Sequence, residues 1–444
     1  MIIAKKLGKI DNQQWVAALI IILMAETLAI IGFTSSMPII PFYIQTKFGI
    51  TNPNQLKIWN GLLNAVPTLM LAFFAPIWGA LADSRGRKAM LVRALTGGGF
   101  SIGLMFFAQN IYQLFILRMI QGATTGSIAA ANVLVLSIVP FQHSAISLAI
   151  LQIGIFIGTA LGPLFGGWIF DNWGGQINFL VSAALILTGC TTVLLTIKEP
   201  PLDNKDAAGH IKKIRWIPDF SILKKYHSIT FLISAMFFSQ MAIALVNTQL
   251  GLFVAELNAN PSTIGSVTGM VFASGAISAS AGALFFGYLS KKVPLQVCFI
   301  ISLAGAAVGY FPQAFSTSWH FLLMIKLIDS FFIGGITPVF NAVLNILAPE
   351  KQRGAIFGIS SSVSFMGSAF GPFIGSAIAV SFGTAGNRVI FIFGSIILGG
   401  ILLTALTIKT YWQDLNREVN KKLCQSSEKN QSKETETETP LMAD

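Results

Sequence analysis

Four ionisable side chains stand deep inside long apolar stretches of the 444-residue sequence, namely Glu26, Arg118, Lys326 and Asp329. A charge in such surroundings is costly without a partner or a water-filled cavity, so it marks a pathway for ions or substrate. Glu26 lies near the middle of its stretch, where a desolvated carboxyl group can bind and release a proton. We predict that Glu26 carries a coupling proton and is a candidate contact for cationic substrates; a purely structural carboxylate is the alternative.

The other three charges differ from Glu26 in their neighbours along the chain. Lys326 and Asp329 are three residues apart, which places them on one helical face as an ion pair. Because a paired acid tends to stay ionised, Asp329 is expected to serve gating or coupling more than proton carriage. Arg118 has no carboxylate on its own helix, so we expect it to pair across helices or to line a cavity.

The composition indicates which elements must hold these charges. Apolar residues make up 54% of the chain and charged residues 11%, whereas soluble domains carry about 25% charged residues. The runs are continuous, so they favour helices over the short alternating strands of a membrane barrel. The predicted fold class is an all-α polytopic membrane protein. A crossing helix needs roughly 20 apolar residues, and such runs predict twelve spans near 15–40, 57–81, 89–108, 112–137, 145–169, 177–197, 228–253, 262–289, 295–312, 319–341, 354–380 and 388–408.

The basic residues predict the orientation of these spans. With both termini in the cytoplasm, 24 of the 29 Lys and Arg residues fall in cytoplasmic segments, as the positive-inside rule requires. The net charge of +11 is therefore a topology signal, and nucleic acid is excluded as a partner. We predict a multi-pass protein of a bacterial inner membrane.

The two halves of the chain repeat one another. Arg118, Gly126 and Asn132 recur as Lys326, Gly334 and Asn341 at offsets of 208, 208 and 209. Such duplication predicts two homologous six-helix bundles that rock about a site between them, which favours alternating access over a channel. The predicted organisation is an N-terminal bundle over residues 1–197, a cytoplasmic linker over 198–227, a C-terminal bundle over 228–412 and a disordered cytoplasmic tail over 413–444.

Three motifs give this architecture a family resemblance. One is the segment from Gly79 to Lys88 after span two, another is Leu117 to Gly122 in span four, and the third is the glycine-rich span five around Gly162 and Pro163. Together they resemble the signature motifs of the major facilitator superfamily, specifically its drug/proton antiporter branch and, within it, bacterial multidrug exporters. The resemblance covers nearly the whole chain, and it implies a role for Arg118 in proton coupling.

The segment after span two is expected to act as a gating loop. Gly79 and Gly86 allow close backbone approach in a tight turn, and Asp83 could face the positive N-terminus of a neighbouring helix, which the resemblance implies is span eleven. Arg87 and Lys88 would anchor the loop at an anionic membrane surface. We expect this loop to hold the halves together in the outward-open state. The second half carries Lys291 where Asp83 stands, so only one such latch is expected.

Span five carries a stripe of glycines at every fourth position. The stripe lets a second helix approach closely, and Pro163 removes a backbone hydrogen bond and bends the helix. Span eleven repeats this pattern around Gly371 and Pro372. We predict that span five packs against span eight, and span eleven against span two, as a hinge at the interface of the halves. The span-five motif comprises Gly154, Gly158, Gly162, Pro163, Gly166 and Gly167.

The substrate cavity is expected to be apolar, aromatic and adaptable, with a few amides that seek a partner or water. The resemblance favours a proton-coupled exporter of amphipathic or cationic organic compounds. A dedicated exporter of one metabolite or siderophore is the alternative, followed by an importer or a membrane sensor. No catalytic or metal-binding set is evident, so we predict no enzyme activity, no cofactor apart from the coupling proton, and a monomer in membrane lipid. The predicted cavity residues are Tyr43, Asn132, Gln240, Asn247, Phe331 and Asn341.

Overall fold

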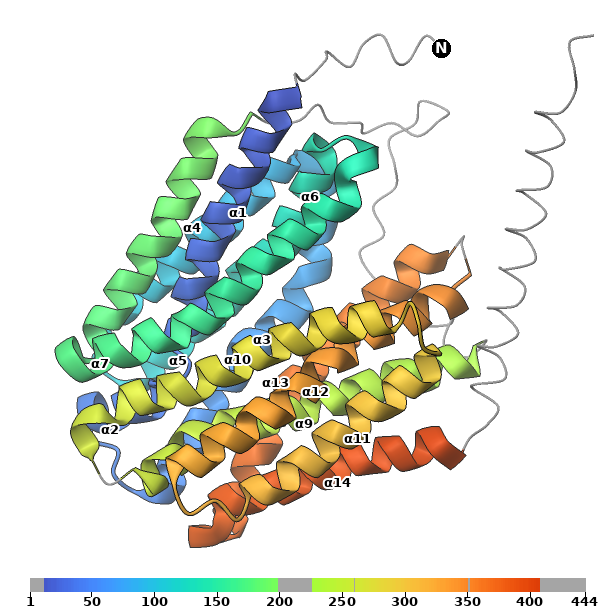
Figure 1. Cartoon of the computed structure of the whole chain (residues 1–444). Helices are drawn as coiled ribbons and strands as arrows, with labels where there is room; N and C mark the ends of the chain where they lie inside the picture. Colours follow the sequence, from blue (N-terminus) through green and yellow to red (C-terminus); the bar gives the residue numbers. More distant parts are fainter. Residues whose placement is uncertain (1–11, 199–225, 259, 350–351, 408–444) are drawn as a thin grey trace, which may run out of the picture.

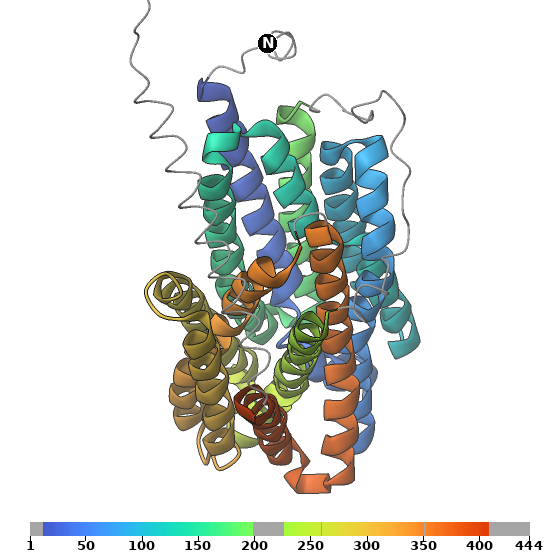
Figure 2. The ribbon, with the colours of Figure 1, turned by 90° about the vertical axis from the view of Figure 1, so that its right-hand side faces the viewer.

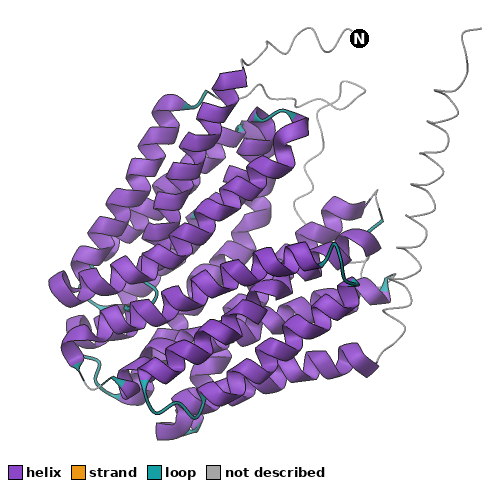
Figure 3. Ribbon diagram, in the orientation of Figure 1, coloured by secondary structure: helices purple, strands orange, loops and turns teal. Residues whose placement is uncertain are grey.

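The computed structural model of the chain describes residues 12–198, 226–258, 260–349 and 352–407. Within these ranges the chain forms helices and no strand (Figure 3). The predicted tail, 413–444, and nearly all of the predicted linker lie outside the described residues. The helices are α1 (Asn12–Ser35), α2 (Ile40–Phe48), α3 (Pro53–Arg85), α4 (Arg87–Met105), α5 (Ile111–Thr124), α6 (Ser127–Ile138), α7 (Ser144–Thr196), α9 (His227–Leu257), α10 (Ile264–Leu289), α11 (Leu295–Gln313), α12 (Trp319–Leu347), α13 (Arg353–Ser381) and α14 (Gly386–Thr407).

These helices contain the twelve predicted spans. Ten segments of the described chain are long and apolar enough to cross a membrane. The 53-residue α7 holds two of the spans, joined at Gly174, where the backbone takes φ 82° and leaves the helical region. The one remaining span, third in order along the chain, is α4, which has three basic residues in its first seven positions. The prediction of an all-α polytopic membrane protein is confirmed.

The helices form two bundles with separate apolar cores (Figure 1). One core joins side chains of α1 to α7, and only Leu252 of α9 reaches it from the other half. The second core joins α9 to α14. Within each bundle the pairs α1–α7 and α9–α13 pack in equivalent ways, as the internal repeat predicts. Figure 2 shows several C-bundle helices nearly end-on where the N-bundle helices stand upright, so the two bundles are inclined to each other.

The two bundles meet along two seams, α7 against α10 and α3 against α13. This confirms the predicted pairing of span five with eight and of span eleven with two. Both seams lie at the end of the molecule that carries α2, which we call the closed end. At the opposite end, where α1 begins, the bundles separate (Figure 1). There an added Cβ at Gly79, Gly287, Gly354 or Gly358 would meet nothing within 4 Å. We call this the open end.

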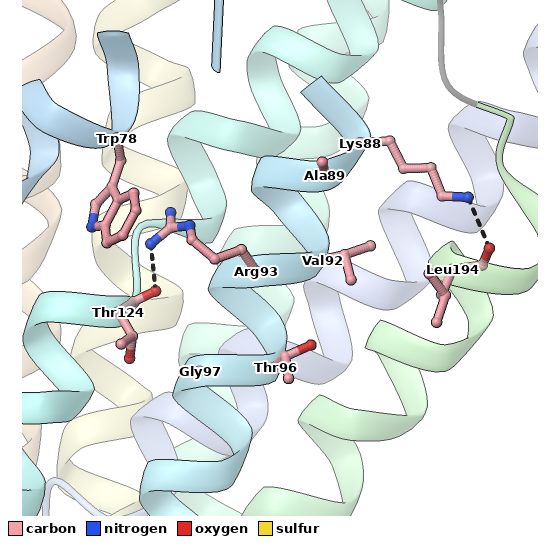
Figure 4. A pocket seen from close by; sticks show the side chains of 9 residues that line it. All are labelled: Trp78, Lys88, Ala89, Val92, Arg93, Thr96, Gly97, Thr124 and Leu194. Atoms are coloured by element: carbon pink, nitrogen blue, oxygen red, sulfur yellow. Dashed lines mark hydrogen bonds between the residues drawn. The ribbon is translucent and has the colours of Figure 1, made fainter. Parts of the chain in front are cut away.

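Span four departs from the prediction of one continuous helix. It divides into α5 and α6 at Thr125 and Gly126, and Gly126 takes φ 113°, a conformation that side chains other than glycine rarely adopt. Two donors satisfy the carbonyl groups at the end of α5, because Trp78 donates to the oxygen of Ala123 and Arg93 donates to that of Thr124 (Figure 4). The equivalent span ten, α12, is continuous.

Candidate functional site

Glu26 is buried in α1 beside the break in span four. Its side chain is 1% exposed, and its Oε1 atom accepts a hydrogen bond of 2.8 Å from the hydroxyl of Ser127, the first residue of α6. The carboxylate therefore lies at the N-terminal end of a half-helix, where the backbone dipole favours negative charge. Its Oε2 atom has no hydrogen-bond partner among the described residues. Among the described residues, the ionised carboxylate is therefore stabilised by one hydrogen bond and by the N-terminal end of α6.

Arg118 lies in α5 and is 6% exposed. Its guanidinium donates to Oε1 of Gln121 at 3.1 Å and to the hydroxyl of Ser36, between α1 and α2, at 3.2 Å. The expected contact across helices is therefore made to a hydroxyl, and in the part of the chain that the structure describes no carboxylate forms an ion pair with it. Its positive charge is held by neutral acceptors alone.

Lys326 and Asp329 form the predicted ion pair on α12. The Nζ atom of Lys326 lies 3.4 Å from Oδ2 of Asp329, and both residues are buried. Gly275 of α10 and Gly309 of α11 border the pair, so it sits inside the C-terminal bundle and away from both seams. It occupies the positions that Arg118 and Gln121 hold in the first half. Each half thus buries a cation beside an acceptor three residues later, and only the second acceptor is a carboxylate.

The glycine stripe of span five faces α1 of its own bundle, so its predicted face was wrong. Side chains or carbonyl groups of α1 lie against Gly154, Gly158, Gly162 and Gly166. Contact with span eight falls to the neighbouring face of α7, at Gly167 and the carbonyl of Pro163. The stripe of span eleven behaves in the same way, because its glycines, Gly371 among them, face α9 while the carbonyl of Pro372 lies near α3. Glycines at every fourth position share one face of the helix, but this spacing does not determine which helix packs against that face.

Two charged residues that the sequence left unassigned hold the closed end together. The carboxylate of Asp171 accepts hydrogen bonds from the backbone N–H groups of Gly265 and Ser266, at 2.8 and 2.7 Å, at the start of α10. Lys57 of α3 is 5% exposed, and its Nζ donates to the carbonyl oxygens of Ala379 and Gly383, at 3.0 and 2.7 Å, where α13 ends. Each seam therefore contains one charge of the N-terminal bundle placed against a helix end of the other bundle.

The gating segment is more helical than expected. Asp83 belongs to the last turn of α3, and its side chain lies outside the described part of the structure. Gly86, with φ 107°, is the single residue between α3 and α4. Lys88 donates to the carbonyl oxygen of Leu194 at the end of α7, so it ties two helices of one bundle together. Beside it lies a pocket of about 690 Å³ lined by Lys88, Arg93 and Trp78 (Figure 4).

The predicted cavity residues fall into two groups. Tyr43 is fully buried between Phe48 and Phe179, so it belongs to the interior of the N-terminal bundle. Phe331 is half-buried and packs against phenylalanines of α10 and α12. The amides are more accessible. Gln240 lies 3.5 Å from the hydroxyl of Thr337 in a partly exposed contact, Asn132 and Asn247 are half-buried, and Asn341 is exposed.

The fold and its duplicated architecture define an integral, multi-pass membrane protein built as a transporter. The chain belongs to the Major Facilitator Superfamily, whose family model matches residues 22–257 and again residues 232–429. The first match covers the N-terminal bundle and continues through α9, and the second begins within α9 and covers the rest of the C-terminal bundle, so each half carries the family pattern.

Curated relatives and solved structures agree with this assignment. The multidrug resistance protein MdtG of Escherichia fergusonii is 29% identical over 376 residues, which cover 84% of this chain and 90% of that protein. The MdtG protein of Salmonella schwarzengrund is 30% identical, with 79% and 86% covered. Among solved structures, a bacterial homologue of the human lysosomal transporter Spinster, inward-facing and unoccupied, superposes with a TM-score of 0.72 at 16% identity, over 93% of this chain and 98% of that one. The human organic anion transporter MFSD10 gives 0.65 at 14% identity, over 89% and 100%.

Proposed function

We propose that this protein is a proton-coupled multidrug exporter that works by alternating access as a monomer in a bacterial inner membrane. The observation that carries the proposal is Glu26, an acid buried in span one at the N-terminal end of half-helix α6. The relatives named as multidrug resistance proteins support export of drugs. Chemically dissimilar amphipathic or cationic compounds are the expected substrates.

The distribution of basic residues supports an orientation with both termini in the cytoplasm. In that orientation the open end faces the cytoplasm, and the conformation described above is inward-facing. A drug would enter between the bundles from the cytoplasm or the inner leaflet. The closed end would then face the outside, and its two seams would have to part before the drug can leave.

Glu26 is suited to couple the proton to this movement. While ionised, its carboxylate is attracted to the positive end of α6 and accepts the hydrogen bond of Ser127. A proton arriving from outside removes that charge and weakens the attraction between α1 and α6. The proton carries energy into the cycle, because one charge crossing the membrane gains about 2.3 kcal/mol per 100 mV. Asp329, already paired with Lys326, would act in gating instead.

The experiment that tests this proposal compares two acids in everted membrane vesicles. A pH-sensitive dye reports proton release when a drug is added. Glu26→Gln is expected to abolish drug-dependent proton release, because the amide cannot bind a proton there. Asp329→Asn is the matched variant and is expected to slow transport while leaving coupling in place. Normal coupled transport by Glu26→Gln would refute the proposal and move Asp329 to the role of proton carrier.

A second measurement identifies the range of substrates. Deleting the gene and comparing drug susceptibility with the excreted metabolites separates a multidrug exporter from a dedicated one. Increased susceptibility to several unrelated cationic compounds is expected. Loss of a single excreted metabolite with unchanged susceptibility would favour the dedicated exporter.

A further inference from the structure

The sequence pattern of the gating segment occurs a second time in the N-terminal bundle. Gly79, Asp83 and Gly86 have the spacing G-x-x-x-D-x-x-G, and Gly167, Asp171 and Gly174 repeat it 88 residues later. In both copies the last glycine leaves the helix with an extended backbone at positive φ, 107° at Gly86 and 82° at Gly174. The first copy lies at the open end and the second at the closed end. One pattern is thus present at both ends of the same bundle.

The helices that face these two copies also resemble each other. The second residue of α10 is Gly265, with Gly269 four residues later, and the second residue of α13 is Gly354, with Gly358 four residues later. The spacing between the two pairs is 89 residues. Both the pattern and its partner therefore recur, which is expected when each bundle contains two three-helix units of inverted topology.

At the closed end the pattern and its partner are engaged. Both carboxylate oxygens of Asp171 accept backbone N–H groups at the start of α10, as bonds of 2.7 and 2.8 Å to a charged acceptor. A Cβ added at Gly167 would overlap the carbonyl oxygen of Gly265, and one added at Gly269 would overlap that of Pro163. The two helices therefore approach more closely than any larger residue allows.

At the open end the same elements are apart. A Cβ added at Gly79, Gly354 or Gly358 would meet nothing within 4 Å. These are the positions that correspond to Gly167, Gly265 and Gly269 at the closed end. The conformation described here therefore has one copy of the contact formed and the other copy open.

We propose that Asp171, with Gly167 and the start of α10, is the closed-end counterpart of Asp83, with Gly79 and the start of α13, and that the two contacts form in turn. The proposal deepens the proposed function, because it names the residues that seal the outer gate of the exporter. Asp171 stabilises the conformation described here, and Asp83 stabilises the opposite one. Because both acids belong to the N-terminal bundle, one rigid rotation of that bundle releases one contact as it forms the other.

Distances between spin labels on the full-length protein in lipid nanodiscs test this. Cysteines are introduced at exposed positions in a variant without Cys190, Cys298 and Cys424. The pair Gln45 and Ser262 reports on the closed end, and the pair Gln142 and Lys292 reports on the open end. Asp171→Asn is expected to lengthen the first distance and shorten the second, changing the ratio of conformations on the order of tenfold. Asp83→Asn is expected to do the reverse, and Asn172→Ala is the neutral control.

A pair of glycine variants supplies a second test, which also serves if an aspartate variant fails to fold. Gly167→Ala removes room only in the present conformation and is expected to favour opening of the closed end. Gly79→Ala has free space here and is expected to favour this conformation. The proposal is overturned if Asp171→Asn or Gly167→Ala leaves both distances unchanged, or moves them in the same direction as Asp83→Asn or Gly79→Ala. These distances need neither drug nor proton gradient, so their outcome is separate from that of the vesicle experiment.

Discussion

The two seams of the closed end have the same backbone design and opposite charges. Gly269 of α10 and Gly61 of α3 are 208 residues apart, which is the offset of the internal repeat. Each lies against the carbonyl of a proline on the partner helix, Pro163 in one seam and Pro372 in the other. The two seams therefore contain the same close helix contact at equivalent positions of the repeat.

The charged contacts of the two seams have diverged. In one, the acid Asp171 on α7 meets the N-terminal end of α10. In the other, the base Lys57 on α3 meets the C-terminal end of α13, and Lys57 occupies the repeat position of Gly265. Each sign of charge is matched to the helix end that favours it. The comparison indicates that the glycine contact is the feature the two seams share, whereas the sign of the charge and the helix end that it meets differ between them.

The largest effect is expected from Lys57→Met. This change removes two hydrogen bonds from a charged donor and leaves the carbonyls of Ala379 and Gly383 without it, at a cost of about 1.5–3 kcal/mol. The closed-end contact should weaken on the order of 10- to 100-fold, as measured by disulfide cross-linking across the α3–α13 seam. The exposed Lys47 provides the control, Lys47→Met, which should change nothing. Unchanged cross-linking in Lys57→Met would show that the glycine contact alone holds this seam.

A smaller effect is expected from adding one methyl group to each seam. Gly269→Ala would collide with the carbonyl oxygen of Pro163. Gly61→Ala would collide with the side chain of Ser376, including its Cβ, and with the carbonyl oxygen of Pro372. Overpacking of this kind costs about 1–3 kcal/mol, so both alanines should weaken their seam and change the initial rate of drug transport in vesicles. Gly399→Ala, where the added carbon has free space, is the control; seam variants that transport at the rate of the control would contradict the prediction.

The smallest effect is the coupling between the two charged contacts. Lys57 and Asp171 lie in separate seams and share no hydrogen-bond partner. Their single-variant effects on the closed-end distance ratio should therefore add in the double variant, to within about 0.5 kcal/mol. A larger coupling energy, in either direction, would mean that a change in one seam alters the geometry of the other, so that the two contacts do not contribute independently to the stability of the closed end.

The sequence predicted much of the architecture, because the relevant signals are long and repeated. Twelve apolar runs defined the spans, the offset of 208 to 209 defined the two bundles, and the spacing of Lys326 and Asp329 predicted their ion pair. The break in span four was missed, because glycines are common in membrane helices and Gly126 alone does not predict an interruption. The face of the span-five stripe was wrong because periodicity does not identify the neighbouring helix.

The residues of the closed end were missed for a different reason. Lys57 was one of five basic residues outside the predicted cytoplasmic segments. Its role in the seam depends on hydrogen bonds to carbonyl groups more than 300 positions away in the sequence. Asp171 follows a glycine-rich motif that drew attention to packing. Its relation to Asp83 is visible only when the segments after spans two and five are aligned with each other. The repeat of the two halves, with its offset of 208 to 209, does not align these two segments, because they lie in the same half and run in opposite directions.

The break in span four also has an electrical meaning. Its two halves, α5 and α6, have 14 and 12 residues, and at 1.5 Å per residue each extends roughly 20 Å. Glu26, hydrogen-bonded to the first residue of α6, therefore lies about half-way along span four. In the exporter proposed above, a proton that reaches Glu26 from outside would fall through roughly half of the membrane potential, or about 1.1 kcal/mol per 100 mV. The membrane voltage would thus act on two separate steps of the cycle, proton arrival and proton departure, with comparable force.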